Sequence, residues 1–522
     1  MKKTIRGLLT LVIAVVAYCV VPKQHNITVV ATNDLHGRFF DSAYVADKTN
    51  PSSLSKISQY VNNLRNDLGK NHVILLDIGD VLQGDNAVYY YNYKDTSGQA
   101  HLMSRIFNYM QYDAVVVGNH DIETGHPVYD KIRTELDMPY LAGNVRNEAD
   151  EPYFLPYTLL KKGGLKIAVI GMTNPNIPNW LTPSLWSGMT FRPIQEKLQE
   201  QIDAIRSNEK VDLLFLAIHA GIGNSSNDLE NPALQLAESF HGIDAIFAAH
   251  DHRRFCSKAG PDSIWVLEGG SRASHVAQLE IQYNSSLGKI SDLTKKASLI
   301  KMDTCPSDPN YNERFAADYR KVQDFTLRPV GTMSQAMDFS ESLTGQSFYL
   351  DFIHTVQLES TGAQLSIAAP LNTRIRLEAG TLNYNHLFQI YPFENQLYEV
   401  WMTGEEVKDF LEHSYDAWVA ERGPSYNFDS VAGLIYEVDC KAATGKRIRI
   451  KSLANGDKFN PKAQYRVAIN SYRASGTGDL ESRVSQRLPE IRELIDQYVN
   501  EQGKIGPETL PTEKIGHWRF IF

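Results

Sequence analysis

The chain has 522 residues, which is more than one ordinary hydrophobic core accommodates and predicts at least two domains. Its composition is that of a globular protein, with 43% hydrophobic and 22% charged residues. The formal net charge of -9 and the pI of about 5.9 argue against a protein that coats nucleic-acid polymers, because such proteins carry a basic surface. A small charged ligand held by metals and a few side chains stays compatible with this charge.

Residues 1–25 have the pattern of an export signal. Lys2, Lys3 and Arg6 precede an apolar run over Leu8–Val21, which is shorter than the roughly 20 residues of a spanning helix. Cys19 leaves open a lipoprotein signal, with membrane attachment through the lipidated cysteine, and the apolar segment itself leaves open an uncleaved anchor. We therefore expect an exported protein of the periplasm or cell envelope.

Three cysteines remain after this segment: Cys256, Cys305 and Cys440. An exported protein is free to form a disulfide, and Cys256–Cys305 is the pairing we expect, although sequence alone leaves the connectivity open.

The first half of the chain alternates strand-like and helix-like segments, which predicts an α/β domain over residues 26–302. Short apolar runs rich in Val, Ile and Leu predict strands buried on both faces at Ile27–Ala31, Val73–Leu76, Ala114–Val117, Lys166–Ile170, Leu213–Ile218 and Ala245–Ala248. Two further strands are expected at Ile264–Leu267 and His275–Tyr283. Helical patterns between the strands cover Ser53–Leu68, Ala100–Met110 and Ile194–Asn208.

The composition changes at residues 303–330, where a stretch rich in Pro, Asn and Asp is followed by a polar helix expected over Glu313–Thr326. We interpret this segment as a linker and hinge. A second α/β domain is expected over residues 331–522. Its predicted elements are helices at Leu350–Leu358 and Gly404–Trp418 and strands at Gln396–Met402, Gly433–Val438 and Tyr465–Asn470.

Five predicted strands of the first half end in the same way, with possible metal ligands in the next few positions. The loops are Asn33–Gly37, Asp77–Asp80, Gly118–Asp121, His219–Gly221 and His250–His252. Ligand sites in α/β sheets lie just beyond the carboxyl ends of strands, so these loops can converge on one cleft. Packing requirements seldom place donors at five strand ends, whereas ten of the fifteen histidines, such as His354, have an ordinary structural explanation.

The donors in these loops are carboxylates, imidazoles and one amide, a set that suits Mn, Zn, Fe or Co. Asp34 and His36 stand two positions apart, as do His250 and His252, which places each pair on one face of an extended segment. Glycines beside the donors permit tight turns and a close approach of the backbone: Gly37, Gly79, Gly84, Gly118 and Gly221.

Together these five motifs resemble those of the calcineurin-like metallophosphoesterases, and the likeness spans residues 26 to about 300. The second half is similar to the second domain of the 5'-nucleotidase family, above all to its branch of periplasmic 2',3'-cyclic-nucleotide 2'-phosphodiesterase/3'-nucleotidases. The resemblance implies a four-layer αββα metallophosphoesterase domain followed by an α/β substrate domain.

Individual roles follow from the resemblance. Two divalent metal ions are implied, and it assigns one of them to Asp34, His36, Asp80 and His252. It assigns the other to Asp80, Asn119, His219 and His250, with Asp80 bridging the two. It also implies a catalytic dyad of His120 and Asp121. Related members often carry Glu at the position of Asp121.

In the second domain, Phe393 and Tyr472 match an aromatic pair that clamps the nucleotide base. The 5'-nucleotidase branch carries a loop whose arginine meets the phosphate, but this chain has Ser366–Pro370 there, as the cyclic phosphodiesterase branch does. The implied activity is therefore 2',3'-cyclic-nucleotide 2'-phosphodiesterase with 3'-nucleotidase activity, by an exported monomer that scavenges nucleotides. A 5'-nucleotidase or nucleotide-sugar hydrolase, and a surface protein with an inactive metal site, remain the alternatives.

Overall fold

A computed structural model describes residues 23–45, 49–224, 228–286, 289–420 and 423–522. The expected export signal and Cys19 lie outside these residues, apart from the last positions of the signal. Two compact units are present: one contains the chain up to Pro178 and Ser184–Tyr319, and the other contains Asn179–Pro183 and Arg320–Phe522. Among the helices of the described part, none combines the length and the apolar character needed to cross a membrane.

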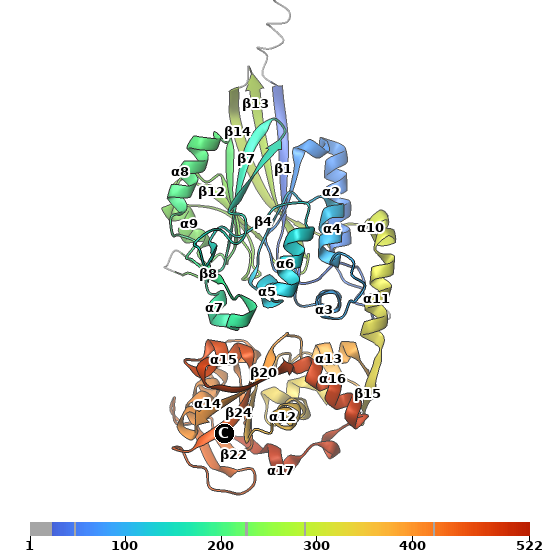
Figure 1. The fold of residues 1–522 in the computed structure, drawn as a ribbon, viewed down its shortest axis with the longest axis vertical. Coiled ribbons are helices and arrows are strands. Elements are labelled where there is room, and N and C mark those ends of the chain that lie inside the picture. Colours follow the sequence, from blue (N-terminus) through green and yellow to red (C-terminus); the bar gives the residue numbers. More distant parts are fainter. Residues whose placement is uncertain (1–22, 46–48, 225–227, 287–288, 421–422) are drawn as a thin grey trace, which may run out of the picture. The chain divides into compact units, whose positions relative to one another are not determined.

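The first unit is built on two six-stranded mixed sheets (Figure 1). The first sheet has the order β14-β13-β1-β2-β3-β4, with strands Lys23–Thr32 (β1), Val73–Asp77 (β2), Ala114–Val116 (β3), Tyr140–Leu141 (β4), His275–Ser286 (β13) and Lys289–Lys301 (β14). The second has the order β11-β12-β10-β9-β7-β6, with strands Tyr157–Lys162 (β6), Leu165–Thr173 (β7), Leu213–His219 (β9), Ala245–Phe247 (β10), Arg254–Ala259 (β11) and Ile264–Gly269 (β12). A short pair, Val145–Asn147 (β5) and Met189–Phe191 (β8), lies apart from both.

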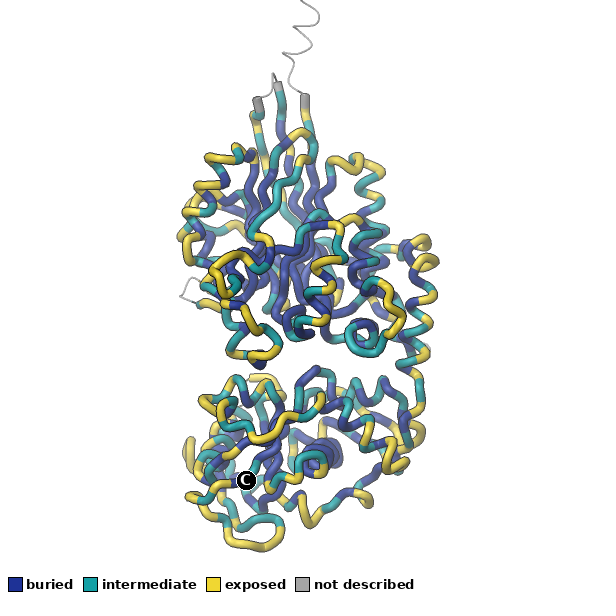
Figure 2. The backbone as a smooth tube through the Cα atoms, viewed as in Figure 1, coloured by how far each residue is buried: buried dark blue, intermediate teal, exposed yellow. Residues whose placement is uncertain are grey.

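The two sheets pack face to face through alternate residues of their strands. Val29 and Ala31 of β1 share one buried cluster with Phe215 and Ala217 of β9, as the two-residue period of a strand requires. The opposite face of the second sheet is covered by helices α8 (Leu198–Glu209) and α9 (Ala233–Ser239). Figure 2 shows the central strands as the most deeply buried part of this unit, and β2 and β9 are buried at every residue, in agreement with the predicted strands buried on both faces.

Helices also cover the outer face of the first sheet, which completes the expected four-layer αββα arrangement (Figure 1). The helices on this side are α2 (Leu54–Leu68), α4 (Leu102–Met110) and α6 (His126–Glu135). Helix α2 shows why the sequence predicted a helix here. Ser53 caps its first turn by accepting from the Lys56 N–H at 3.3 Å, and Leu54, Ile57 and Val61 form its buried face.

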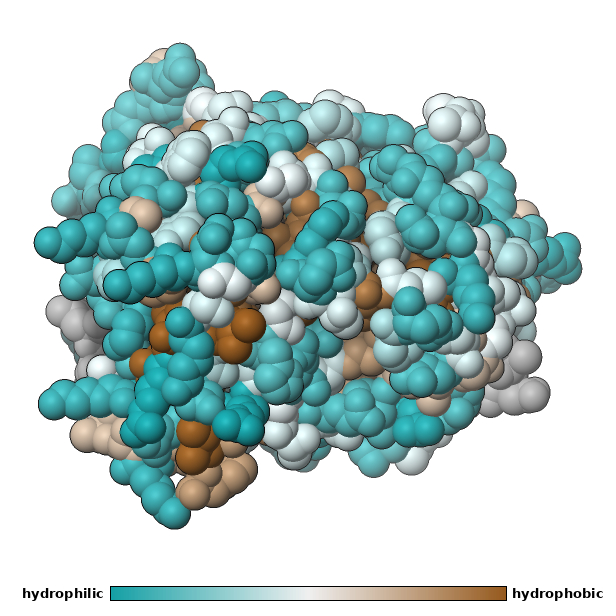
Figure 3. All heavy atoms as spheres, turned by 90° about the horizontal axis from the view of Figure 1, so that it is seen from below, coloured by the Kyte–Doolittle hydropathy of each residue, from teal (hydrophilic) through white to brown (hydrophobic). Residues whose placement is uncertain are grey.

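Among the sheets of the second unit, a five-stranded sheet and a three-stranded sheet lie around a shared apolar cluster. The larger sheet has the order β21-β17-β24-β20-β25, with strands Leu365–Ala368 (β17), Gln396–Thr403 (β20), Ser430–Ala432 (β21), Gln464–Asn470 (β24) and Val484–Glu490 (β25). The smaller sheet contains Leu434–Asp439 (β22), Ile448–Leu453 (β23) and Gly516–Ile521 (β27). The main helices are Phe348–Thr361 (α12), Tyr384–Ile390 (α13), Gly404–Val419 (α14), Ser471–Gly476 (α15) and Ile491–Gln502 (α16). Hydrophilic residues dominate the face drawn in Figure 3, where apolar atoms gather in small separate areas.

Two sequence expectations need correction. The single helix expected over Glu313–Thr326 is in fact two consecutive helices, α10 (Pro309–Arg314) and α11 (Ala316–Leu327), and the division between the units falls inside α11. The pairing of Cys256 with Cys305 is wrong, because both are free thiols: Cys256 lies on edge strand β11 of one sheet, and Cys305 follows edge strand β14 of the other.

Candidate metal centre

The five donor loops follow strands that are parallel neighbours. Strands β1, β2 and β3 lie side by side in the first sheet, and β9 and β10 do so in the second. Parallel strands end at the same edge of a sheet, so the loops after them gather in two sets. Backbone hydrogen bonds join the first two loops, from Asp34 N–H to the Gly79 carbonyl (2.9 Å) and from His36 N–H to the Asp80 carbonyl (3.0 Å). The His250 N–H donates to the Asp34 carboxylate at 3.1 Å and so links the two sets.

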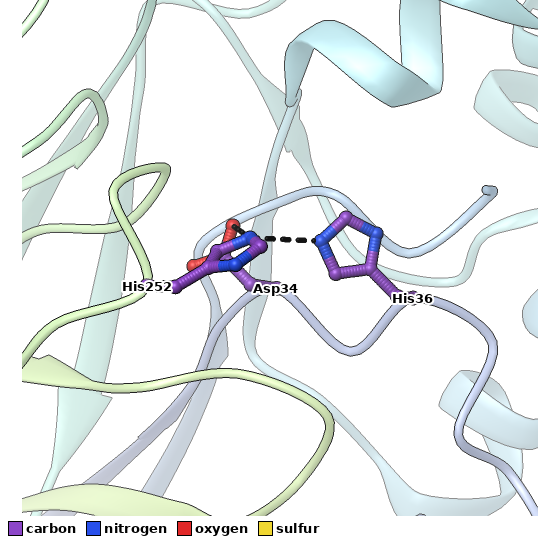
Figure 4. A group of neighbouring side chains, drawn as sticks. All are labelled: Asp34, His36 and His252. Carbon is purple, nitrogen blue, oxygen red and sulfur yellow. Dashed lines mark hydrogen bonds and ion pairs between the residues drawn. The ribbon is translucent and has the colours of Figure 1, made fainter. Parts of the chain in front are cut away.

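The first donor group consists of Asp34, His36 and His252, which face one another in Figure 4. The Nε2 atoms of His36 and His252 are 3.0 Å apart, and His252 Nε2 is 3.6 Å from Asp34 Oδ1. The outer nitrogen of the His36 ring, Nδ1, bonds the Gln83 carbonyl at 3.0 Å, which directs Nε2 inward. Two imidazole nitrogens and a carboxylate oxygen thus converge on one point.

The second group contains Asp80, His219 and His250, and Asn119 joins it through its amide oxygen. Asn119 Oδ1 lies 3.1 Å from His219 Nε2 and 3.0 Å from His250 Nδ1. Asp80 Oδ2 is 3.2 Å from the same His219 nitrogen. Within each group, the three ligand atoms offered by His and Asp lie within 4.8 Å of one another. Nitrogen and oxygen donors at this spacing fit a divalent transition-metal ion.

The backbone of these loops is held in an unusual conformation. Five of the nine sequence-predicted residues of the first unit have positive φ without being glycine: Asp34 (47°), His36 (46°), Asp80 (58°), His250 (88°) and His252 (57°). Each such residue costs on the order of 1–3 kcal/mol and persists only where the surroundings hold it in place, as they do at many functional sites. The fold therefore stores strain to aim these side chains.

Burial and mutual pairing decide the protonation of the donors. Burial lowers the pKa of His36 well below its ordinary value, so this ring is neutral and has a lone pair to offer. Burial opposes ionisation of Asp80, yet the His219 and His120 rings keep the pKa of Asp80 well below its ordinary value. Burial also opposes protonation of His219, but the Asp80 carboxylate outweighs it and raises the pKa of His219 to about 9. A metal ion bound by Asp80 and His219 would take the place of the proton that lies between these two side chains.

His120 lies on the short helix α5 (Asn119–Glu123), beside the first donor group, with its ring centroid 5.5 Å from that of His36. The sequence paired His120 with Asp121, but the structure brings Glu123 to the ring instead, with Glu123 Oε2 2.5 Å from His120 Nδ1. The Asp121 carboxylate is buried and accepts four backbone N–H groups, those of Gly118, Asp80, Val81 and Leu82. It therefore shapes the loop rather than orienting the imidazole.

Sequence reasoning missed Glu123, although a signal for it was present. Side chains three positions apart on a helix are neighbours, and His120 and Glu123 have this spacing. Adjacent residues such as His120 and Asp121 point in different directions on a helix, which is why the predicted pair does not meet.

Phe393 and Tyr472 belong to the second unit and lie near the same end of two paired strands of its larger sheet. Phe393 precedes β20 and Tyr472 follows β24, and these strands pair Leu397 with Asn470. Phe393 is half-buried and Tyr472 is 44% exposed. The Tyr391 hydroxyl accepts from the Asn395 (3.4 Å) and Asn470 (3.3 Å) side-chain amides, so the two segments are tied to each other.

Two arginines, Arg374 and Arg376, follow Ser366–Pro370 in the second unit. Arg376 is ion-paired with Glu378 (3.0 Å) and Asp338 (3.2 Å), and Arg374 is exposed. A cavity of about 690 Å³ between α14 and the residues around Asp479 belongs to the same unit, but neither Phe393 nor Tyr472 lines it.

Comparison with known proteins finds a family model that matches a segment in each half of the chain. Residues 27–254 match the family model of calcineurin-like phosphoesterases, and residues 329–482 match that of the 5'-nucleotidase C-terminal domain. A putative 5'-nucleotidase from Staphylococcus aureus has the same fold, with a TM-score of 0.82 over 95% of this chain and 99% of its own at 19% identity.

Two relatives extend the match over almost the whole chain. The 2',3'-cyclic-nucleotide 2'-phosphodiesterase/3'-nucleotidase of Yersinia enterocolitica is 25% identical over 95% of this chain and 88% of its own length. The trifunctional nucleotide phosphoesterase protein YfkN of Bacillus subtilis is 25% identical over 93% of this chain, which spans 38% of the length of that relative.

Proposed function

Because the chain combines a calcineurin-like phosphoesterase domain with a 5'-nucleotidase C-terminal domain, we propose that it is a metal-dependent phosphoric ester hydrolase acting on nucleotides. The observation that carries this proposal is the convergence of two donor groups, one with Asp34, His36 and His252 and one with Asp80, His219 and His250.

The donor set fits two divalent ions. One ion would be held by Asp34, His36 and His252, the other by Asn119, His219 and His250, and Asp80 would bridge them. When bound, two such ions polarise a phosphoryl oxygen and activate a water molecule for attack on phosphorus. The identity of the ions is left to experiment, with Mn, Zn, Fe and Co as candidates for these donors.

The protein supplies the general acid. Glu123 bonds His120 at Nδ1, so this contact holds the Nδ1 proton and fixes the ring, and in the protonated imidazolium form the second proton, on Nε2, is the one available for donation. We assign His120 the protonation of the leaving sugar oxygen, which otherwise departs as a strongly basic alkoxide. Glu123 takes the orienting role that the sequence had given to Asp121.

The proposed substrate is a 2',3'-cyclic nucleotide, opened to a 3'-nucleotide that is then hydrolysed to the nucleoside. Two observations support it: Ser366–Pro370 lacks an arginine for a terminal 5'-phosphate, and the Yersinia enterocolitica relative is named for this pair of activities. Phe393 and Tyr472 are proposed to stack on the base, since every base offers a π face. We further propose export and scavenging of nucleotides as the setting.

Metal removal tests the proposal. Protein stripped with a chelator should lose hydrolysis of bis-p-nitrophenyl phosphate, and added Mn²⁺, Zn²⁺ or Co²⁺ should restore it. The variant His120→Ala should retain the metal content of the wild type, measured by mass spectrometry, but lose turnover of 2',3'-cyclic AMP by about 10²-fold or more because the general acid for the sugar oxygen is absent. Full activity of the stripped protein would contradict a metal-dependent mechanism.

A further inference from the structure

Glu230 lies in the loop between β9 and α9, next to the second donor group. Its backbone is fixed independently of its side chain: the carbonyl accepts from Gly221 N–H (3.1 Å) and from the Asn174 side chain (3.0 Å). Its N–H donates to Asp228 Oδ1 at 2.9 Å. A substitution that changes only the carboxylate therefore leaves these anchoring contacts of the loop in place.

The Glu230 carboxylate contacts the outer nitrogen of a proposed metal ligand. His250 turns Nδ1 toward Asn119 Oδ1 (3.0 Å), on the side where the donors converge, and its Nε2 lies 3.1 Å from Glu230 Oε1. A carboxylate accepts but cannot donate, so this contact requires the proton of a neutral ring to be on Nε2. The lone pair is then on Nδ1, where a cation would meet it.

This outer contact differs from those of two other imidazoles in the centre. His219 bonds the Ile78 carbonyl through Nδ1 (2.7 Å), and His36 bonds the Gln83 carbonyl. Both acceptors are neutral backbone groups, whereas the acceptor beside His250 is the negatively charged carboxylate of Glu230. A carboxylate behind a ligating imidazole orients the ring and makes it a better donor.

We propose that Glu230 is a positioning residue that fixes the tautomer and the orientation of His250 and thereby determines how tightly the second ion is held. The inference rests on the proposed function only in that Asp80, Asn119, His219 and His250 hold a metal ion. Glu230 itself is 44% exposed, so as a plain surface ion pair it would add little to folding stability.

The test compares Glu230→Gln and Glu230→Ala with Glu238→Gln, an exposed carboxylate on the neighbouring helix α9 with the same change in charge. Full-length proteins are loaded with Co²⁺ and dialysed against graded chelator, and the metal retained per chain is measured. We expect Glu230→Ala to bind one of two ions about 10- to 100-fold more weakly and to change the Co²⁺ absorption spectrum. Glu230→Gln should show a smaller effect, because its amide oxygen still accepts from Nε2.

A merely structural role is separated by the thermal unfolding of the metal-free proteins, which should be the same for all variants and the wild type. Co²⁺ affinity of the wild-type strength in Glu230→Ala would overturn the positioning role, as would an equal loss in Glu238→Gln. Failure of the proposed function looks different: in that case the wild type itself would retain no Co²⁺.

Discussion

Asp80 is held in place by contacts of both its carboxylate oxygens and of its backbone N–H. Its Oδ1 accepts the His120 N–H at 2.8 Å, its Oδ2 faces His219, and its N–H donates to Asp121. The identity of such a donor is visible in the sequence, since a carboxylate after a buried strand marks it. The sequence does not show the left-handed backbone of Asp80 or the hydrogen bond from its N–H to Asp121, because both depend on contacts between loops that follow different strands.

At this scale, the partner of His120 can be tested with two matched variants. Glu123→Gln should lower kcat about tenfold or more, because the amide orients the imidazole poorly and cannot stabilise its charged form. Stability should change little, since Glu123 accepts no buried backbone group in the described contacts. Asp121→Asn should instead destabilise the protein by about 1–3 kcal/mol, because an amide cannot accept all four N–H groups.

Steady-state kinetics and urea unfolding of both variants measure these effects. The reverse pattern, with Asp121→Asn stable but inactive and Glu123→Gln fully active, would restore the dyad predicted from sequence.

The elements that carry the site were largely predictable. Continuous apolar runs marked β1, β2, β3, β9 and β10, and the donors after them were predicted to converge, which agrees with the structure. The family resemblance implied two sheets, but the strand patterns did not reveal which of these strands share a sheet, because strand order depends on contacts between distant segments. The sequence also did not reveal the two helices α10 and α11, whose break at Phe315 interrupts a polar run without a proline or glycine.

Gly118 tests how closely two of these loops approach. A Cβ atom at this position would lie 2.2 Å from Asp80 Oδ1 and 2.3 Å from the Asp80 nitrogen, so Gly118→Ala must push the two loops apart. We expect a loss of stability of about 1–3 kcal/mol and weaker metal retention. Urea unfolding and metal content measure both.

The control is Gly98→Ala, whose added methyl meets no atom within 4 Å, although its positive φ of 70° adds local strain. It should lose some stability but keep its metal. Normal metal retention in Gly118→Ala would show that the loops are less tightly packed than the structure indicates.

On the scale of the whole molecule, two compact units were expected from length, and the family resemblance of each half is confirmed by the matched family models. Contacts between segments that are distant in the sequence were not predicted. Asn179–Pro183 groups with the second unit although the surrounding chain belongs to the first, and the expected disulfide is absent from the described cysteines. Both depend on which distant segments meet, and local sequence patterns carry no information about that.

Two buried histidines predict the pH dependence of stability, one in each unit. Burial lowers the pKa of His101 and of His354 from the ordinary value of 6.5 to about 3. Between these two pKa values the unfolded chain binds more protons than the folded chain. The contribution of these histidines to the free energy of unfolding is therefore fully present above pH 6.5 and is lost as the pH falls toward 3. Each histidine contributes a slope of about 1.4 kcal/mol per pH unit in this range.

Urea unfolding between pH 7.5 and 5 tests this slope with His354→Gln. His354 bonds Ser366 (2.9 Å) and Ser430 (3.0 Å), so the variant should be less stable at neutral pH but should lose less stability on acidification. The exposed His241→Gln should keep the wild-type slope. An unchanged slope in His354→Gln would mean that this ring is protonated in the folded protein.

The most direct test of the proposed activity is the hydrolysis of 2',3'-cyclic AMP, 3'-AMP and 5'-AMP by the metal-reconstituted protein, with kcat/KM measured for each. We expect 2',3'-cyclic AMP to be opened to 3'-AMP and 3'-AMP to be hydrolysed to adenosine, with 5'-AMP the poorest substrate because the loop at Ser366–Pro370 has no arginine for its phosphate. A preference for 5'-AMP, or no hydrolysis of any of the three by protein with two ions bound, would contradict the account.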